Sequence, residues 1–530
     1  MAIYLNQNSD KFISYKNDDI FVDKSLLIKE TNASLNKESK KFMCLTRPRR
    51  FGKTMALNLL NAYYSKGCSS RGLFEDLAIS RDPSFEKHLN KHNVFCIDMS
   101  SLYTSLIDKS EFVPKLRARL LSDFQEAYPS IDFSTCLIDD AFSKIKTATG
   151  DRFIFLIDEW DVIYREEEQN KKLCDEYTEF LRSLFKSGDV SSNIDLVYMT
   201  GILPIRRYST QSTLNMFVEY NMLDPDCLAP LFGFTAEEVQ ALCDEHGMGF
   251  TEIKSWYDGY KLGGIEIYNP KSVVEAMDLK RCGNYWTKTS AIEAVTDYMN
   301  FDHGALKGEI VRMLNGEAVE LNPDKFSNDL TIVNSRDAAL TVLVHLGYLA
   351  YLPPKKGGQN GSCYIPNEEI RGEFENAIEA LGWKDIYDPI SNSPKLCEET
   401  FKGNLAFINE TLDRNHKEMA SFINKNDENV LAVIVSTSYY KARDYYRVKQ
   451  EDTCVSGRSD LSFFPTEPGH LPFIIELKVG HSPDEAIEQI KRKRYWEAFP
   501  EYKGKVLLVG ISYDEATLKH SSKVEWIEVK

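Results

Sequence analysis

A short stretch near the N-terminus combines residue types and a spacing that suit phosphate chemistry. In residues 42–54, FMCLTRPRRFGKT, the residues Gly52, Lys53 and Thr54 follow an apolar run and a basic loop. A loop of this kind between a strand and a helix presents backbone N–H groups to a phosphate. Lys53 would reach the β- and γ-phosphates, and the Thr54 hydroxyl would bind Mg²⁺. The stretch therefore predicts a P-loop that binds a nucleotide.

The loop departs from the usual G-x-x-x-x-G-K-[ST] pattern, because Arg47 stands where the first glycine is expected. Glycine is preferred there since it tolerates positive φ and close backbone approach. Arg49, Arg50 and Phe51 complete the part of the loop that we expect to contact the nucleotide. We expect the Lys53 ammonium to face solvent when no nucleotide is bound. A chance GKT in a solvated basic loop is the alternative.

A second apolar run, residues 153–157, ends in Asp158 and Glu159. Such a continuous run is typical of a buried parallel strand, and ligands bind at the C-terminal ends of these strands. We expect Asp158 to hold the Mg²⁺ ion and its water shell, and Glu159 to orient the attacking water. An acidic pair that only caps a strand–helix junction is the alternative. Thr200 ends a further strand and would sense the γ-phosphate.

A second candidate site lies near the C-terminus. Residues 473–479 read as a strand, and the alternation of strand side chains places Glu476 and Lys478 on one face. Burying an acid and a lysine there is costly unless they have partners. Asp460, on a neighbouring strand, supplies one through a metal ion, and two carboxylates that bind Mg²⁺ beside a lysine suit phosphodiester hydrolysis. The alternative is an exposed strand face, where E-x-K is common.

The helix that follows supports this second site. Ser482 to Glu485, SPDE, has an N-cap serine, a proline at the first helical position and a glutamate at the third. The helix carries Gln489 and then a basic run. Because the chain has a net charge of −16, nucleic acid has to be held by local basic patches. A solvated helix face is the alternative for this run. The predicted nucleic-acid contacts are Lys491, Arg492, Lys493, Arg494 and Tyr495.

The composition places the chain among soluble globular proteins. It has 530 residues, of which 43% are hydrophobic and 27% are charged, and this length suits about two to four domains. Eleven cysteines without a C-x-x-C pair point to a reducing compartment and argue against structural zinc. We find no signal peptide and no membrane-spanning run, so we expect a cytoplasmic protein with no membrane partner. The oligomeric state is left open, with a homo-oligomer as one option.

Alternating apolar runs and helical patterns predict an α/β domain with a parallel sheet over residues 1–224. Its strands are expected at the apolar start of 42–54 and at 93–98, 153–157 and 196–199.

From 225 to 394 the pattern turns helical, and Thr235 with Glu238 has capping-box spacing. Aromatic residues around turns, such as 256–260 and 285–286, are more often core than cofactor contacts, so we assign this region to a lid and spacer. Residues 355–361 read as a turn between two short strands. The third domain is expected over 395–530, with its border near 388–394.

With both sites in view, the chain resembles the AAA-ATPase-like proteins that carry a C-terminal PD-(D/E)XK nuclease domain, and the resemblance covers almost its whole length. It rests on FVDKSLLIKE (21–30), LTRPRRFGKT (45–54), FLIDEWD (155–161), MTG (199–201), WYDGYKL (256–262), YNPKSVV (268–274), NYWTKTS (284–290), SGRSDLSFF (456–464), IIELKV (474–479) and EQIKRKRY (488–495).

The resemblance implies that Arg47 is inherited, because the loop of that family reads RPRRFGKT. It also implies a nuclease core with supporting residues, namely Asp460, Glu476 and Lys478 with Glu428, Gln489 and Tyr495. Residues 203–222 depart from the usual pattern, which weakens a nucleotide contact for Arg206 or Arg207. Defence against foreign nucleic acid, or its processing, is the setting that the resemblance suggests.

The sequence thus predicts an α/β protein with three parts: a P-loop NTPase domain, a helical middle and a PD-(D/E)XK nuclease-like domain. We expect it to bind and hydrolyse ATP with Mg²⁺ and to cleave nucleic acid, with the nuclease regulated by the nucleotide state. The rival hypothesis is an NTP-dependent switch or scaffold whose nuclease-like domain is inactive and only binds nucleic acid or protein. The sequence does not distinguish DNA from RNA.

Overall fold

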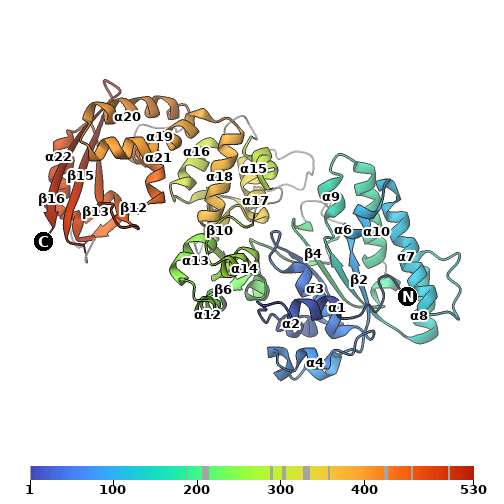
Figure 1. Ribbon diagram of the computed structural model, residues 1–530. Coiled ribbons are helices and arrows are strands. Elements are labelled where there is room, and N and C mark those ends of the chain that lie inside the picture. The colour runs from blue at the N-terminus through green and yellow to red at the C-terminus, as the bar shows by residue number, and fades with distance from the viewer. Residues whose placement is uncertain are drawn as a thin grey trace. The chain divides into compact units, whose positions relative to one another are not determined.

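The structure is a computed structural model of the 530-residue chain (Figure 1). It describes residues 2–186, 188–205, 214–286, 291–300, 306–325, 335–355, 358–422, 428–454, 457–498 and 502–529. The chain forms two compact units, which are described separately. The first contains Met1–Ala291 and Glu320–Gly372, and the second contains Ile292–Val319 and Glu373–Lys530.

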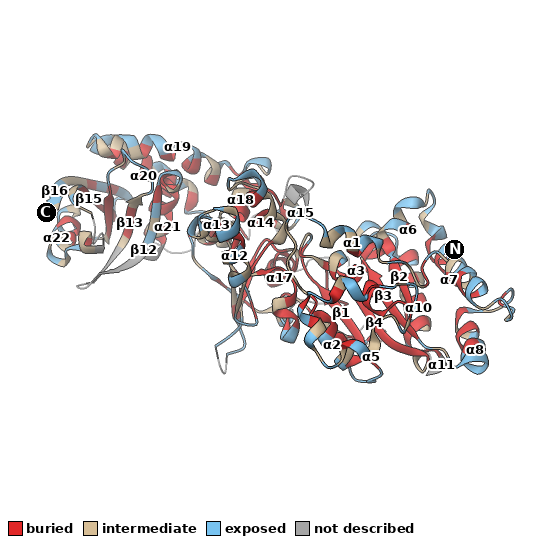
Figure 2. Cartoon of the chain, turned by 60° about the horizontal axis from the view of Figure 1, so that its bottom comes forward, coloured by how far each residue is buried: buried red, intermediate tan, exposed pale blue. Residues whose placement is uncertain are grey.

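A five-stranded parallel sheet lies at the centre of the first unit. Every residue of β1, β3 and β4 is buried, as expected for parallel strands that are covered on both faces (Figure 2). Because the strands are parallel, their C-terminal ends meet at one edge, beside the loop that follows β1. In order across the sheet, the strands are β2 (Asn93–Asp98), β3 (Phe153–Asp158), β4 (Ile194–Gly201), β1 (Phe42–Thr46) and β5 (Val218–Tyr220).

Helices cover both faces of this sheet (Figure 1). On one face, α3 (Lys53–Tyr64) packs against β2, β3 and β4. On the other, phenylalanines of α7 (Phe112–Ala127), α8 (Ile138–Thr149) and α10 (Lys171–Lys186) meet those of β2 and β3, with ring centroids 5.3–5.6 Å apart. The other helices before β5 are α1 (Asp10–Lys16), α2 (Leu27–Ser34), α4 (Arg71–Phe74), α5 (Phe85–His88), α6 (Met99–Ser105), α9 (Val162–Glu166) and α11 (Gly188–Ser191).

The middle of the chain is mainly helical, with two three-stranded sheets of order β6-β8-β7 and β10-β11-β9. Their strands are β6 (Phe234–Thr235), β7 (Tyr260–Leu262), β8 (Ile265–Tyr268), β9 (Val319–Leu321), β10 (Ala350–Leu352) and β11 (Gly361–Tyr364). The helices are α12 (Ala236–His246), α13 (Phe250–Tyr257), α14 (Pro270–Leu279), α15 (Ala291–Met299), α16 (Lys307–Leu314), α17 (Arg336–Leu346), α18 (Glu368–Ala380) and α19 (Lys384–Phe401).

The second unit contains a five-stranded sheet of order β12-β13-β14-β15-β16. Only β14 and β15 pair in parallel, and the other neighbours are antiparallel. The helix α22 packs on one face, and α20 and α21 pack on the other. Bounds are α20 (Leu405–Met419), α21 (Glu428–Ser438), β12 (Tyr446–Cys454), β13 (Gly457–Pro465), β14 (Phe473–Val479), α22 (Pro483–Lys493), the short helix η8 (Tyr495–Ala498), β15 (Gly504–Asp514) and β16 (Lys519–Val529).

A glycine lets α22 lie close to this sheet. A Cβ at Gly510 would come within 2.3 Å of the Pro483 carbonyl oxygen, at the start of the helix. Gly510 is also the β15 partner of Glu476 in the parallel register. The close approach therefore brings side chains of α22 over the part of β14 that carries Glu476.

The fold predicted from the sequence is confirmed: an α/β protein with an N-terminal parallel sheet, a helical middle and a C-terminal mixed sheet. The capping boxes at Thr235 and Ser482 form as predicted, and β10 and β11 flank the predicted turn. The sequence did not indicate β5 or the sheet of β6, β7 and β8. The border expected near 388–394 lies inside α19, which contains Pro389 and Pro394. Among the described helices, none is both long and apolar enough to cross a membrane.

Candidate functional site

The loop between β1 and α3 is shaped by two residues with positive φ, Arg50 at 67° and Gly52 at 83°. Gly52 is the N-cap of α3, and a Cβ there would meet no atom within 4 Å. Within the described residues, we find no protein acceptor for the backbone N–H groups of Gly52, Lys53 and Thr54. Such N–H groups at the start of a helix attract anions. The loop therefore fits the phosphates of a nucleotide.

Lys53 does not face solvent, so that expectation is wrong. Its ammonium donates hydrogen bonds to the carbonyl oxygens of Arg47 at 3.0 Å and Pro48 at 2.8 Å, and the residue is 7% exposed. Burial lowers the pKa of Lys53 to about 8, although the nearby charges of Asp158 and Glu159 favour the protonated form. The lysine thus spans the loop from inside.

Arg47, which replaces the first glycine of the motif, directs its side chain to backbone carbonyl oxygens next to the loop. Its side chain is fully buried and donates to the carbonyl oxygens of Thr46 at 2.9 Å and Tyr220 at 3.1 Å. Burial lowers the pKa of Arg47 to about 10. Since Tyr220 belongs to β5, Arg47 ties the start of the loop to the edge strand. Positive φ is found instead at Arg50 and Gly52, so the position needs no glycine.

Arg49 and Arg50 of the loop contact the middle region of the chain. The Arg50 guanidinium donates to the Tyr285 carbonyl oxygen at 3.3 Å. The Arg49 carbonyl oxygen accepts from Trp286 Nε1 at 3.1 Å. Sequence reasoning assigned residues 285–286 to the core of a spacer and missed this contact. The contact joins two segments that lie far apart in the sequence, so the pattern within either segment does not indicate it.

The other two loop residues differ in exposure. Thr54 is exposed at the first turn of α3, and its binding of a metal ion stays a prediction. The Phe51 ring is buried and packs edge-to-face on Tyr260 at 5.5 Å. Any contact of Phe51 with a nucleotide would therefore come from its backbone.

At the end of β3, Asp158 is 4% exposed and accepts a hydrogen bond from Thr200 Oγ1 at 2.5 Å. The fully buried Thr200 hydroxyl therefore orients Asp158. Glu159 has a φ of 49° and accepts from the Arg165 guanidinium at 2.7 Å. The sheet thus brings Asp158, Glu159 and Thr200 together, as predicted, but their roles stay predictions. Arg206 and Arg207 lie outside the described residues.

Three residues near this edge were missed by sequence reasoning. Arg165 lies on α9 and pairs with Glu159 and Asp161. The Asp161 carboxylate is fully buried and accepts from two backbone N–H groups just after β4, at 3.0 Å each. Tyr15 of α1 has its pKa raised by burial and then by the charge of Asp158. The sequence offered one signal, since an arginine four residues after an aspartate suits an ion pair on a helix.

In the second unit, β13, β14 and α22 bring the predicted carboxylates, lysine and glutamine together. Glu476 is 1% exposed, and its Oε1 accepts from Lys478 Nζ at 3.0 Å and from Gln489 Nε2. Asp460 Oδ2 accepts from the Leu477 backbone N–H at 2.7 Å. The predicted placement of Glu476 and Lys478 on one face of the strand is correct.

The electrostatics of this cluster suit a cation. Burial, and then the charge of Asp460, raise the pKa of Glu476 to about 8, while Lys478 opposes the shift. Among the described residues, Glu476 Oε2 is buried and has no hydrogen-bond partner, so it is available to a metal ion. No group of three or more His, Cys, Asp or Glu side chains in the described ranges could hold one. Two carboxylates suffice for Mg²⁺, which usually keeps several waters.

One predicted residue of this site needs correction, and the prediction for a second is not tested. Tyr495 is expected to contact nucleic acid, but its side chain is 1% exposed and its hydroxyl accepts from Gln489 Nε2 at 3.1 Å. Tyr495 therefore positions Gln489. Glu428 begins α21, but its side chain lies outside the described part of the chain.

The basic run after Gln489 is partly neutralised. Lys491 pairs with Glu525 of β16 at 2.8 Å and with Glu488 at 3.2 Å, and Arg494 pairs with Glu497 at 3.0 Å. These pairs engage the charges of Lys491 and Arg494, while the contact of residues 491–494 with nucleic acid stays a prediction.

Two other basic residues lie on the face of the sheet that carries the carboxylates. Arg447 and Lys449 of β12 are exposed, and their cations lie 5.3 and 5.1 Å from the centre of the Phe464 ring. Lys449 is paired with Ser462, and Ser462 with Ile474. Because paired strand residues share a face, Arg447 and Lys449 lie on the same side as Glu476.

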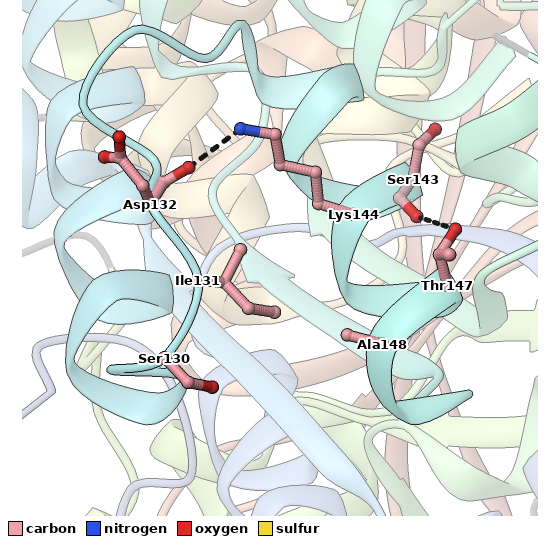
Figure 3. A pocket seen from close by; sticks show the side chains of 7 residues that line it. All are labelled: Ser130, Ile131, Asp132, Ser143, Lys144, Thr147 and Ala148. Carbon is pink, nitrogen blue, oxygen red and sulfur yellow. Dashed lines mark hydrogen bonds between the residues drawn. The ribbon is translucent and has the colours of Figure 1, made fainter.

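A shallow hollow of about 540 Å³ lies between the loop before α8 and that helix (Figure 3). Lys144 Nζ donates to the Asp132 carbonyl oxygen at 2.8 Å and closes one side. No residue predicted for either site lines the hollow. The lining residues are Ser130, Ile131, Asp132, Ser143, Lys144, Thr147 and Ala148.

Comparison with known families matches both regions. Residues 10–210 match the family described as predicted AAA-ATPase, and residues 426–523 match the PD-(D/E)XK nuclease superfamily. The chain carries an AAA-ATPase-like domain and a PD-(D/E)XK nuclease superfamily domain. It is also 22% identical over 261 residues to the "Uncharacterized protein in vnfD 5'region" of Azotobacter chroococcum mcd 1. The match spans about half of each chain, 48% of both.

These matches agree with the position of the two sites. The AAA-ATPase-like domain includes the loop with Lys53 and the strand end with Asp158, and the PD-(D/E)XK domain includes Asp460, Glu476 and Lys478. The contacts of Tyr260, Tyr285 and Trp286 with the loop come from outside both matched regions.

The buried Lys53 of the AAA-ATPase-like domain gives a pH prediction. Bound phosphates favour protonated Lys53, whose pKa in the free protein is about 8. Above that pH, binding has to take up a proton, so ADP affinity without metal should fall by up to about tenfold per pH unit. Lys53→Ala should remove most of the affinity and this pH dependence.

Calorimetry from about pH 7 to 9.5 measures both effects. Lys40→Ala, at an exposed lysine just before β1, is the control and should bind as the wild type does. Equal ADP affinity in Lys53→Ala and wild type would remove Lys53 from the nucleotide site.

Proposed function

We propose that this protein binds and hydrolyses ATP in its first unit and cleaves phosphodiester bonds of nucleic acid in its second. We further propose that the nucleotide state regulates the cleavage. The observation that carries the proposal is the cluster of Asp460, Glu476 and Lys478. In this cluster, Glu476 Oε2 is buried and has no hydrogen-bond partner among the described residues. If E-x-K were only part of an exposed strand face, Glu476 would not be buried, because burial of a carboxylate costs free energy.

In the nucleotide site, the backbone N–H groups from Gly52 to Thr54 would bind the phosphates, and Lys53 would turn from the loop carbonyls to them. Thr54 and Asp158 would hold Mg²⁺, which neutralises developing charge on the phosphates. Glu159 would orient the attacking water after its carboxylate leaves the Arg165 ion pair. Thr200 would keep Asp158 in position.

In the nuclease site, Asp460 and Glu476 would hold the metal ion. A bound Mg²⁺ would supply Lewis-acid polarisation of the scissile phosphate and a lowered pKa for a bound water. Gln489 fixes the orientation of Glu476, and Tyr495 fixes Gln489. Lys478 already donates to Glu476 and would add a positive charge beside the attacking water.

The nucleic acid backbone would lie along the carboxylate face of the sheet, contacted by Arg447 and Lys449. Both are exposed on β12 and lie on the face of the sheet that carries Glu476. In a chain of net charge −16, such a local patch has to overcome general repulsion. Regulation by nucleotide state would restrain a nuclease that is otherwise harmful to the cell.

A second candidate function is a switch or scaffold whose nuclease-like domain only binds. It is favoured by the raised pKa of Glu476, about 8, since a protonated carboxyl does not bind a metal ion. An active nuclease would bind Mg²⁺ with release of that proton and would then cleave nucleic acid. A domain that only binds would not cleave. A cleavage assay over DNA and RNA, with and without Mg²⁺ and ATP, decides between them.

Glu159→Gln should keep ATP bound and slow hydrolysis by about 10²-fold or more, because the amide cannot accept the proton of the attacking water. Phosphate release and ATP binding are measured on the same preparation. Glu168→Gln, at an exposed carboxylate just after α9, is the control and should hydrolyse ATP normally. Equal loss of binding and turnover in Glu159→Gln would contradict the assigned role.

Asp460→Ala, Glu476→Ala and Lys478→Ala should each abolish cleavage and leave ATP hydrolysis without nucleic acid unchanged. The two carboxylate changes should also weaken Mn²⁺ binding, measured by calorimetry, whereas the lysine change should not. Glu485→Gln, at an exposed carboxylate of α22, is the control for charge. Cleavage that survives all three replacements would place the nuclease elsewhere or in a contaminant.

Arg447→Gln with Lys449→Gln should weaken binding of nucleic acid and reduce the slope of log affinity against log salt by about two. The matched control, Lys491→Gln with Arg494→Gln, removes the same charge from ion-paired positions and should have a smaller effect. Binding is measured by fluorescence anisotropy in Ca²⁺, on DNA and on RNA. If the control pair has the larger effect, the backbone follows α22 instead.

A further inference from the structure

A tryptophan from the middle region holds the nucleotide loop by its backbone. Trp286 is 7% exposed, and its Nε1 donates to the Arg49 carbonyl oxygen at 3.1 Å across 237 residues of sequence. The indole packs on Tyr348 with ring centroids 5.1 Å apart. A Cβ at Gly347 would lie 2.8 Å from the Pro48 ring and 3.3 Å from Trp286. The absence of a side chain at Gly347 therefore lets Pro48 of the loop and Trp286 pack closely around it.

The residue before Trp286 contacts the next loop position. The Tyr285 carbonyl oxygen accepts from the Arg50 guanidinium at 3.3 Å. Arg50 is held at a φ of 67°, a conformation that non-glycine residues rarely adopt. Such a backbone persists only when its surroundings hold it. Tyr285 and Trp286 thus fix the two loop residues that precede Phe51.

A buried carboxylate in turn fixes Tyr285 and Trp286. Glu369 is 2% exposed, and its Oε1 accepts from the backbone N–H groups of Tyr285 at 2.7 Å and Trp286 at 2.8 Å. Ser272 Oγ donates to the same carboxylate at 2.8 Å. Hydrogen bonds to a buried carboxylate are among the stronger ones in proteins. Glu369 therefore sets the position of the segment that holds the loop.

We propose that Trp286 and Glu369 are positioning residues of the nucleotide site. Glu369 orients the backbone of residues 285–286, the Trp286 indole fixes the Arg49 carbonyl, and the loop is kept in the shape that presents its N–H groups. This inference rests on the proposed binding of a nucleotide at the loop. Its ligand is a nucleoside di- or triphosphate.

The same residues lie next to the points where the chain leaves the first unit. The first unit ends at Ala291 and, after its second stretch, at Gly372, which lies within α18. Glu369 is in the first turn of that helix, and Trp286 precedes α15.

The test uses the full chain. Trp286→Phe keeps an aromatic ring on the side of Tyr348 but removes the N–H and shortens the ring system, so the dissociation constant for ADP should rise about two- to tenfold. Glu369→Ala should weaken binding by about tenfold or more, because it removes both backbone contacts. Glu369→Gln keeps an acceptor for them and should bind within about threefold of the wild type. Glu373→Gln, at a similarly buried glutamate one turn along α18, is the matched control and should bind normally.

A spectroscopic measurement separates positioning from general loss of stability. The chain has six tryptophans, and fluorotryptophan labelling gives each a ¹⁹F resonance, with Trp286 assigned from Trp286→Phe and Trp256 from Trp256→Phe. On titration with ADP, the Trp286 resonance should shift with the midpoint found by calorimetry, while that of Trp256 should stay in place. Thermal unfolding of every variant confirms that it is folded.

Three outcomes are distinguishable. Weaker binding in Trp286→Phe and Glu369→Ala, rescue in Glu369→Gln and a moving Trp286 resonance support the inference. Wild-type affinity in folded Trp286→Phe and Glu369→Ala, with an unmoved Trp286 resonance, overturns it and leaves the nucleotide site intact. If the wild type binds neither ADP nor ATP, the proposed nucleotide site fails, and the positioning role fails with it.

Discussion

A charged group removed from water needs partners, and this requirement shapes both sites of the protein. Lys53 is buried inside its own loop and is held by the carbonyl oxygens of Arg47 and Pro48. Glu476 is buried in a strand and is held by Lys478 and Gln489. Burial favours the neutral form of each group. It lowers the pKa of Lys53 to about 8 and raises the pKa of Glu476 to about 8. Ligands that restore the missing counter-charge, phosphates for Lys53 and a cation for Glu476, are thereby favoured.

The sequence predicted those features that depend on local periodicity. Parallel strands bring their ends to one edge, so Asp158 and Thr200 were expected beside the loop. The period of two along β14 placed Glu476 and Lys478 on one face. The capping boxes at Thr235 and Ser482 follow from residues three positions apart. Each of these arguments uses neighbours within a single element or the direction of a strand.

The remaining features depend on partners far away in the sequence. Glu525, which neutralises Lys491, comes from β16, and Glu369 reaches Trp286 across 83 residues. The expectation that the Lys53 ammonium faces solvent is wrong because the carbonyl oxygens of the loop accept its hydrogen bonds in place of water. Every residue type supplies such a carbonyl oxygen, so the sequence does not indicate the contact. Spacing alone carries no information about such contacts.

The contacts around Phe51 and Arg49 bear on how far the nucleotide-binding part of the chain extends. The matched AAA-ATPase-like region ends at residue 210, yet Tyr260, Trp286 and Gly347 cover the loop from later in the chain. A fragment cut after residue 224 would leave the Phe51 ring in water and the Arg49 carbonyl without its indole donor. The smallest autonomous nucleotide-binding piece would need to run to about α18, so exchange of this module between proteins would have to carry the middle region with it.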